Sequence, residues 1–549
     1  MQRFEALRLS IVTYHQWPGN NPWSVGGQPL LPTVVATTFS IDGVAVLLFG
    51  TFWGLRISAI AYLVVGYWGA WKVSRLFWPE PVLRLVFALY TITNAAIAYH
   101  LAVGHLAFEN FWYIPWFLYF ILRATDDGWS GVKAGVLFGL ACVRAPAYVP
   151  QYAGLLFAGL LCWLWWKQRR EHNRTFARWL MLFVPVLATI VFYRFSTMFY
   201  GLLDFPRIST WRGHLDSPSM LTVFFRPFTD LDRSLDNVTT LSIPIWEVAC
   251  YLGVTSILLA CLSLLKGVHW WHVMTVLLMW AFSGNDSMYY LMFWIQKIPS
   301  YSSLQTFTRV RLFIPLFLGI AATSGLSFLW SATSHRRLLR PLVLLLSFAL
   351  VAEVMIVSHK ILKTSHMPFV YAGGDNPDGL FRNISQLPRP SGIPGEVNLV
   401  YSATKMNLGW LRGYGDSNLP GNTIRVGLND AGYIGEYFQG HRPVTPIYWS
   451  PNRLVFEHLD PSVALSLNMN PSKAWYANGR QLFPHYRIVE VDKAFDIMPD
   501  AQGRVDLEYR FPGQSIGVAG TAIFSVISLI MCFAVSRWPN RPNPAYLTQ

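Results

Sequence analysis

The chain has 549 residues, of which 53% are hydrophobic and only 13% are charged, with a mean hydropathy of +0.34. Soluble globular proteins carry roughly 25% charged residues, so this composition excludes an ordinary soluble enzyme and a disordered protein. Apolar stretches of about 20 residues recur along the chain, long enough to cross a hydrocarbon core of about 30 Å as helices. The sequence therefore predicts a polytopic α-helical membrane protein.

The net charge of +14 is unevenly distributed along the chain. Sixteen basic and only four acidic residues lie in six short segments, which are 72–84, 123–133, 167–178, Lys266, 336–340 and 537–541. The polar block 359–516 is almost balanced, with 15 basic and 14 acidic residues. Because short cytoplasmic loops retain Lys and Arg, this excess is a topology signal, and we expect no nucleic-acid partner.

Eleven apolar segments predict membrane helices. They lie at about 52–72, 84–104, 108–123, 131–148, 151–166, 179–201, 246–265, 269–283, 310–330, 341–358 and 518–536. Threading them through a membrane puts every Lys/Arg-rich loop on the cytoplasmic side. The outer side then holds residues 1–51, 202–245, 284–309 and 359–516.

The N-terminal segment is the part of the chain that this topology does not explain by itself. Segment 33–50 is apolar but short and contains Asp42, so we interpret it as an interfacial or re-entrant piece. If it crossed the membrane, the agreement of every later loop with the positive-inside rule would invert. Residues 1–51 then lie outside with no helix before them, and we expect a first helix upstream of Met1.

We divide the chain into a transmembrane domain, a β-rich extracytoplasmic domain, and a last helix with its tail, which span 1–358, 359–516 and 517–549. The middle block is rich in Gly, Pro and Asn. Near its end, 486–491 and 505–511 alternate apolar and polar residues around a turn cluster, which predicts a β-hairpin.

Chemistry in such a protein needs polar groups that converge at the membrane boundary. His105 and Glu109 lie at an outer turn between two helices, close to His100. Glu109 could be a general base, a metal ligand with His105, or half of an ion pair, and the turn could also be simply exposed to water. Arg144, near the outer end of its helix, suits a lipid phosphate or snorkels to bulk lipid.

Two further features stand beside these residues. Arg309 and Arg311 precede a helix and could bind a phosphate or pyrophosphate. Segment 14–32 is dense in Pro, Gly, Asn and Trp, so its backbone must be irregular. It is too apolar for a free loop, so we expect it to lie on a membrane surface or to pack over a site.

Residues 22–30 (PWSVGGQPL) resemble the W-N-P-x-x-x-G-G-x-P loop of bacterial YfhO-like membrane proteins, which belong to the GT-C superfamily of lipid-dependent glycosyltransferases. Further similarities follow in the same order along the chain. They include GYWGAWKVSR at 66–75, Arg309 and Arg311 before a helix, and AWYANG at 474–479. The resemblance therefore extends over nearly the whole chain.

The resemblance implies a GT-C-like fold of about eleven membrane helices in the bacterial inner (plasma) membrane. It implies transfer of a sugar from a polyprenyl-phosphate carrier, among membrane lipids, to a cell-envelope acceptor at the outer face. A divalent metal, Mg²⁺ or Mn²⁺, often assists such enzymes. Their catalytic Asp follows the first helix, so here it would lie upstream of Met1.

The same resemblance suggests roles for the candidate residues. His105 and Glu109 would line the catalytic cleft, and Arg144, with Arg309 or Arg311, would hold the donor phosphate. The cavity would be shaped by a loop that contains Trp23, Gly26, Gly27 and Pro29. Two other functions stay open: a flippase or transporter of lipid-linked glycans, and a non-catalytic envelope assembly protein.

Overall fold

The computed structural model describes most of the chain, with gaps. The described residues are 1–31, 38–145, 149–168, 174–204, 222–228, 249–283, 294, 297, 307–333, 339–364, 379–384, 401, 403–411, 426–428, 430–470, 472–482, 495–510 and 513–537. The first strand of the predicted hairpin, 486–491, lies outside them.

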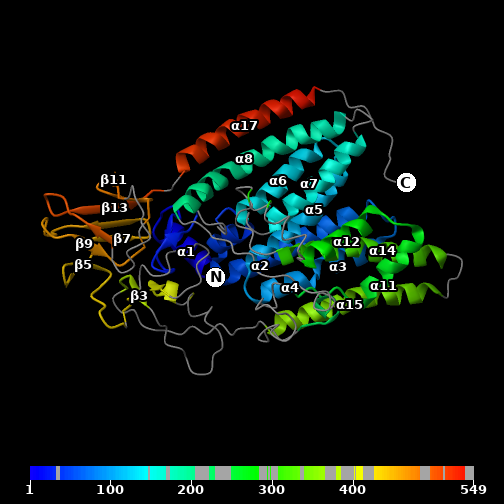
Figure 1. Ribbon diagram of the computed structural model, residues 1–549, viewed down its shortest axis with the longest axis horizontal. Coiled ribbons are helices and arrows are strands. Elements are labelled where there is room, and N and C mark those ends of the chain that lie inside the picture. The colour runs from blue at the N-terminus through cyan, green and yellow to red at the C-terminus, as the bar shows by residue number, and fades with distance from the viewer. Residues whose placement is uncertain are drawn as a thin grey trace. The chain divides into compact units, whose positions relative to one another are not determined.

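Helices dominate the structure (Figure 1), and seven in the described residues are long and apolar enough to cross a membrane. They are α2 (Ile41–Ser74), α3 with α4 (Pro81–Ile92 and Ala95–Ala102), α7 (Val149–Gln168), α8 (Arg174–Asp204), η7 with α14 (Phe307–Phe313 and Ile314–Ala332), α15 (Arg340–Thr364) and α17 (Gln514–Ser536). This confirms the polytopic helical class.

The other four predicted spans coincide with shorter helices. These are η2 with α5 (Leu106–Tyr113 and Ile114–Leu122), α6 (Ser130–Arg144), α11 with η5 (Val254–Ser263 and Leu264–Lys266) and α12 (Trp270–Ser283). A helix rises 1.5 Å per residue, so helices of this length fall short of a 30 Å core unless they are extended. The count of eleven spans stays a prediction.

The chain reverses direction near the start of α2. Gly50 has φ +74° and ψ 166°, a combination open almost only to glycine. A Cβ added to Gly54 would lie 2.6 Å from the Ala45 carbonyl oxygen, although these residues are nine apart in sequence. Residues 41–49 therefore fold back on the following turns. Residues 33–37 lie outside the described residues, and the interpretation of 33–50 as an interfacial or re-entrant piece stays a prediction.

Glycines allow several membrane helices to approach closely. A Cβ added to Gly325 of α14 would clash with the Leu259 carbonyl oxygen of α11, and these two helices pack together. Small residues at such contacts let helix backbones meet without intervening side chains, which is a common source of stability in membrane bundles. The residue at position 325 thus controls how closely α11 and α14 pack.

Gly325→Ala is expected to destabilise the helix bundle by at least about 1 kcal/mol, because the added methyl group must displace backbone atoms. Gly159→Ala is the matched control, since nothing lies within 4 Å of a Cβ at position 159 of α7. This change should be neutral or slightly stabilising, because alanine favours helices. Thermal unfolding in detergent measures both; equal behaviour of the two variants would contradict the close α11–α14 contact.

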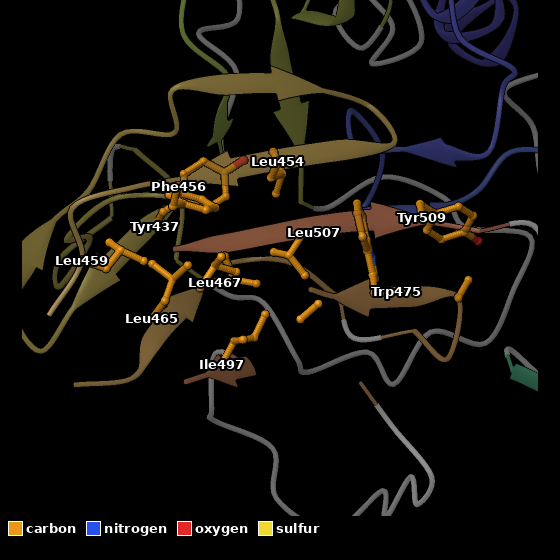
Figure 2. Close-up of a cluster of buried hydrophobic side chains, with 13 residues drawn as sticks. Tyr437, Leu454, Phe456, Leu459, Leu465, Leu467, Trp475, Ile497, Leu507 and Tyr509 are labelled. Carbon is orange, nitrogen blue, oxygen red and sulfur yellow. The ribbon is translucent and has the colours of Figure 1, made fainter. Parts of the chain in front are cut away.

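The β-rich region contains two main antiparallel sheets. The five-stranded sheet has the order β11 (Arg480–Gln481), β10 (Trp475–Ala477), β13 (Val505–Tyr509), β8 (Arg453–Phe456) and β7 (Tyr448–Ser450). The four-stranded sheet has the order β12 (Phe495–Ile497), β9 (Leu465–Leu467), β5 (Tyr437–Gln439) and β6 (Arg442–Pro443). Both sheets contribute to one apolar core that includes Leu467, Trp475 and Leu507 (Figure 2).

The chain forms two compact units. Unit 1 comprises Met1–Ser58, Val191–Ile208 and Met367–Ala522, and unit 2 comprises Ala59–Ile190, Ser209–His366 and Ile523–Gln549. Residues 1–58, which we assigned to the transmembrane domain, thus fold with the β-rich block. In unit 1 they form α1 (Gln2–Arg8), η1 (Leu9–Thr13) and a small hairpin of β1 (Asn20–Asn21) with β2 (Gln28–Pro29).

Candidate functional site

The loop that contains Trp23, Gly26, Gly27 and Pro29 is an ordered part of unit 1. Gly26 and Gly27 have positive φ values, as does Val25, so the loop turns sharply between β1 and β2. The Asn470 side chain donates a hydrogen bond to the Gly27 carbonyl oxygen over 2.8 Å, and the Asn470 backbone N–H donates to the Gly26 carbonyl oxygen over 2.7 Å. The β-rich block thus holds the backbone of this loop directly.

Trp23 anchors the same loop. Its side chain is buried, and its indole N–H donates a hydrogen bond to the Asn407 side-chain oxygen over 2.9 Å. Gly26 and Gly27 border a small void of about 20 Å³, which has room for about one water molecule. The neighbours of this loop are residues of the β-rich block.

The other five predicted site residues all belong to unit 2. His105 directly precedes η2 and follows Gly104, whose φ of +80° ends α4. Glu109 lies within η2 and Arg144 is the last residue of α6. The remaining two, Arg309 and Arg311, lie on η7 at the start of a candidate span.

Glu109 and Arg144 form an ion pair in the interior of unit 2. A guanidinium nitrogen of Arg144 lies 2.6 Å from a carboxylate oxygen of Glu109, and the two side chains are 1% and 2% exposed. The Arg144 guanidinium also lies 4.5 Å from the centre of the Tyr62 ring. Of the three roles that the sequence left open for Glu109, the structure contains the ion pair, with Arg144 as its partner.

A hydrogen-bonded chain joins Arg311 to the two histidines. The Arg311 guanidinium donates to Nε2 of His100 over 2.9 Å, and Nδ1 of His100 lies 3.4 Å from Nδ1 of His105. Since Nε2 of His100 accepts a hydrogen bond, the proton of this neutral ring resides on Nδ1 and faces His105. Nδ1 of His105 is then an acceptor, and its Nε2 carries a proton that can be donated.

Arg309 joins this group through an aromatic ring. Phe108 stacks on His100, with ring centres 3.6 Å apart and planes 3° from parallel, and the Arg309 guanidinium lies 5.5 Å from the Phe108 ring centre. Arg311 and His100 are fully buried and Arg309 is 6% exposed. We call His100, His105, Phe108, Arg309 and Arg311 the Arg–His cluster.

The Arg–His cluster has the chemistry of an anion site. Its arginines and imidazoles offer mainly N–H donors, and guanidinium groups match the geometry of phosphate oxygens. His100 lies near the end of one candidate span and Arg309 opens another, so the cluster lies where helices of the membrane domain end.

The same residues do not fit a divalent metal. No group of three or more His, Cys, Asp or Glu side chains among the described residues is arranged to hold one. Mg²⁺ and Mn²⁺ prefer oxygen ligands, whereas the Arg–His cluster offers nitrogen and positive charge. Glu109, the acidic residue nearest in sequence to the Arg–His cluster, is paired with Arg144.

Sequence reasoning selected Arg309, Arg311 and His105 but gave no role to His100 or Phe108. His100 is the central residue, since it contacts Arg311, His105 and Phe108. One signal in the sequence points to it: two histidines five residues apart on either side of a helix end, with a phenylalanine three residues further on.

Comparisons with known proteins give a weak structural likeness. A solved structure of the arabinofuranosyltransferase AftD from Mycobacteria aligns with a TM-score of 0.39 and 16% identity, over 67% of this chain and 25% of that one. A mutant form of AftD aligns with a TM-score of 0.37 and 14% identity, over 64% and 25%. The chain thus spans about a quarter of these proteins. It matches no protein-family model and no curated protein.

Proposed function

We propose that this chain is a membrane glycosyltransferase of the GT-C type, which moves a sugar from a polyprenyl-phosphate carrier to a cell-envelope acceptor at the outer face of a bacterial inner membrane. The observation that carries the proposal is the Arg–His cluster, a group of buried cationic and N–H-donating side chains where membrane helices end. The ordered sequence similarities to YfhO-like proteins support this reaction class. In this proposal the block 359–516 is extracytoplasmic.

In the proposed reaction, an acceptor hydroxyl loses its proton to a general base and attacks the anomeric carbon of the sugar, while the bond from that carbon to the phosphate oxygen breaks. Negative charge grows on the departing phosphate. Arg309 and Arg311 would bind that phosphate, and preorganised donors of this kind stabilise developing charge more strongly than water does. His105 would donate its Nε2 proton in a hydrogen bond to the leaving oxygen, held in this tautomer by His100.

The remaining candidate residues take supporting roles. Glu109 would hold Arg144 in place, and the charge of Arg144 would add to the field felt by the phosphate. We assign the general base to no residue of this chain, and no step uses a metal ion.

Reconstituted protein with a radiolabelled polyprenyl-phosphate sugar tests the proposal. Arg309→Gln and His105→Gln should each lower the transfer rate at least tenfold, which corresponds to about 1.4 kcal/mol of transition-state stabilisation. Arg340→Gln is the matched control, because Arg340 is exposed at the start of α15 and should leave the rate unchanged.

The same preparation separates the alternatives. If the labelled lipid binds in an Arg309-dependent way but no sugar is transferred to any envelope fraction, a non-catalytic assembly protein is the better description. If the lipid instead changes leaflet in sealed vesicles without losing its sugar, the protein is a flippase. If neither binding nor transfer depends on Arg309 and His105, the Arg–His cluster is not the site.

A further inference from the structure

A second candidate site lies wholly within unit 1 and goes beyond the proposed glycosyl transfer. A groove of about 530 Å³ lies over the β-rich region. Its size falls in the range of roughly 300–1,000 Å³ that is typical of small-molecule sites. We call it the β-groove and define it by six of the residues that line it, Tyr14, Phe381, Arg382, Tyr433, Glu436 and Trp449.

One wall of the β-groove is aromatic. Trp449 and Phe381 stack with ring centres 5.1 Å apart and planes 20° from parallel, and Tyr14 meets Trp449 edge-on at 5.4 Å. Phe381, Tyr14 and Trp449 are all partly exposed, so their rings are accessible from the groove. These three residues come from separate parts of the sequence and meet only in the folded unit.

This aromatic wall is fixed to the core of the unit. The Trp449 indole N–H donates a hydrogen bond over 2.9 Å to the hydroxyl of Tyr437. Tyr437 is itself buried, with its ring centre 5.1 Å from that of Phe456. Both side chains belong to the apolar cluster drawn in Figure 2. A ring held in this way loses little conformational entropy when a ligand packs on it, which favours binding.

A second wall of the β-groove is polar and contains Glu436, whose side chain is 6% exposed. Its carboxylate accepts hydrogen bonds from the Asn383 backbone N–H and side-chain amide, both over 2.6 Å, and from the Tyr433 hydroxyl over 2.8 Å. The Tyr433 oxygen keeps lone pairs that can accept a further hydrogen bond. Arg382 adds N–H donors at the same groove.

We propose that the β-groove binds a neutral saccharide. The ring of a sugar has apolar C–H faces, which pack on aromatic faces, and a rim of hydroxyl groups, which need donors and acceptors. The β-groove offers both kinds of surface within one small volume. Among its described lining residues, the only charged types are one arginine and one glutamate, so the β-groove lacks the cluster of cations that would select a phosphate or an acidic polymer. A lipid tail would leave the Glu436 wall desolvated, at a cost in free energy.

The test is a binding measurement on the full-length protein in detergent or nanodiscs. An array of neutral oligosaccharides built from pentoses and hexoses selects the best probe, which is then titrated while tryptophan fluorescence is recorded. We expect saturable binding that Phe381→Ala weakens at least tenfold. Tyr448→Ala is the matched control, because Tyr448 is the exposed neighbour of Trp449 on β7 and does not line the β-groove.

A second variant tests whether weaker binding results from a blocked groove and not from loss of folding. Thr445 is exposed and lines the β-groove, so Thr445→Trp fills the groove from its edge while the aromatic wall stays intact. It should weaken binding at least tenfold with an unchanged unfolding temperature. Failure of every neutral saccharide to bind the unaltered protein would overturn the proposal. So would binding that survives both groove variants, or competition by a peptide or an acidic oligosaccharide but by no neutral sugar.

Discussion

Replacing Glu109 alone by alanine is expected to destabilise unit 2 by about 3–5 kcal/mol, because it leaves the Arg144 guanidinium buried without its carboxylate. The Arg144 and Glu109 side chains are 1% and 2% exposed and lie 2.6 Å apart, so neither can reach water without local unfolding. Breaking a buried pair costs far more than the pair itself contributes, since the remaining charge has lost both water and partner. Unfolding in detergent measures the loss.

A double variant separates charge from packing. Glu109→Leu with Arg144→Met removes both charges and keeps side-chain volume, and should recover most or all of the lost stability. Asp506→Asn is the surface control, because Asp506 pairs with Arg453 over 2.7 Å while the two side chains are 25% and 47% exposed. That change should cost about 1 kcal/mol or less. A Glu109→Ala variant as stable as Asp506→Asn would contradict the buried pair.

The double variant also decides what Glu109 does in the proposed reaction. If the Glu109–Arg144 pair serves only to stabilise the fold, the folded double variant should keep most of its transfer rate. If the field of Arg144 matters to the phosphate, the rate should fall although stability returns. Comparing the two readouts within one protein thus distinguishes a structural ion pair from one that contributes to catalysis.

The helical part of the fold could be predicted from hydropathy because each span is encoded locally. The apolar runs at 179–201 and 341–358 coincide with α8 and α15, since apolar length alone selects a membrane helix. The fold-back of α2 was harder to predict. Asp42 and the shortness of the apolar run indicated an irregular piece, but the reversal depends on the conformation of one glycine, Gly50. Sequence periodicity carries no such information.

The candidate site was only partly predictable because its contacts join distant parts of the chain. Arg311 and His100 are 211 residues apart, and each has an ordinary local setting at a helix end. Likewise, Trp23 reaches Asn407 across 384 residues, so nothing in the loop itself reveals that the β-rich block receives it. Residue types at helix ends suggested Arg309 and Arg311, but their meeting with two imidazoles is a property of tertiary packing.

Glu436 is expected to make the stability of unit 1 fall as pH rises through neutrality. Burial raises the pKa of this carboxyl group from its ordinary value of 4.5 to about 7, while its hydrogen bonds from Asn383, Tyr433 and Asn468 act in the opposite direction. The pKa of the Tyr433 hydroxyl is also raised, by burial and by Glu436, so this hydroxyl remains a donor throughout. Arg382 is the nearby cation, and it lowers the pKa of Tyr433.

The direction of this pH dependence follows from whether the folded or the unfolded state holds the proton of Glu436. Between pH 4.5 and pH 7 the folded unit keeps Glu436 protonated while the unfolded chain has released that proton, so folding binds a proton. The contribution of Glu436 to the free energy of unfolding is complete below pH 4.5 and is lost as the pH rises through 7. From pH 5 to pH 8 we expect a loss of about 2–3 kcal/mol, seen as a fall of several degrees in the unfolding temperature.

Glu436→Gln should remove this pH dependence, because the amide does not titrate, whatever its effect on absolute stability. Glu457→Gln is the matched control, since Glu457 is a surface acid whose side chain is 37% exposed and it should leave the slope in place. The unfolding temperature of each variant, followed by tryptophan fluorescence from pH 5 to pH 8, gives the answer. A slope that persists in Glu436→Gln would assign the titration to another group.

A flat profile in the unaltered protein would mean that the hydrogen bonds to Glu436 outweigh the effect of burial on its pKa and keep the carboxylate ionised. The polar wall of the β-groove would then carry a fixed negative charge.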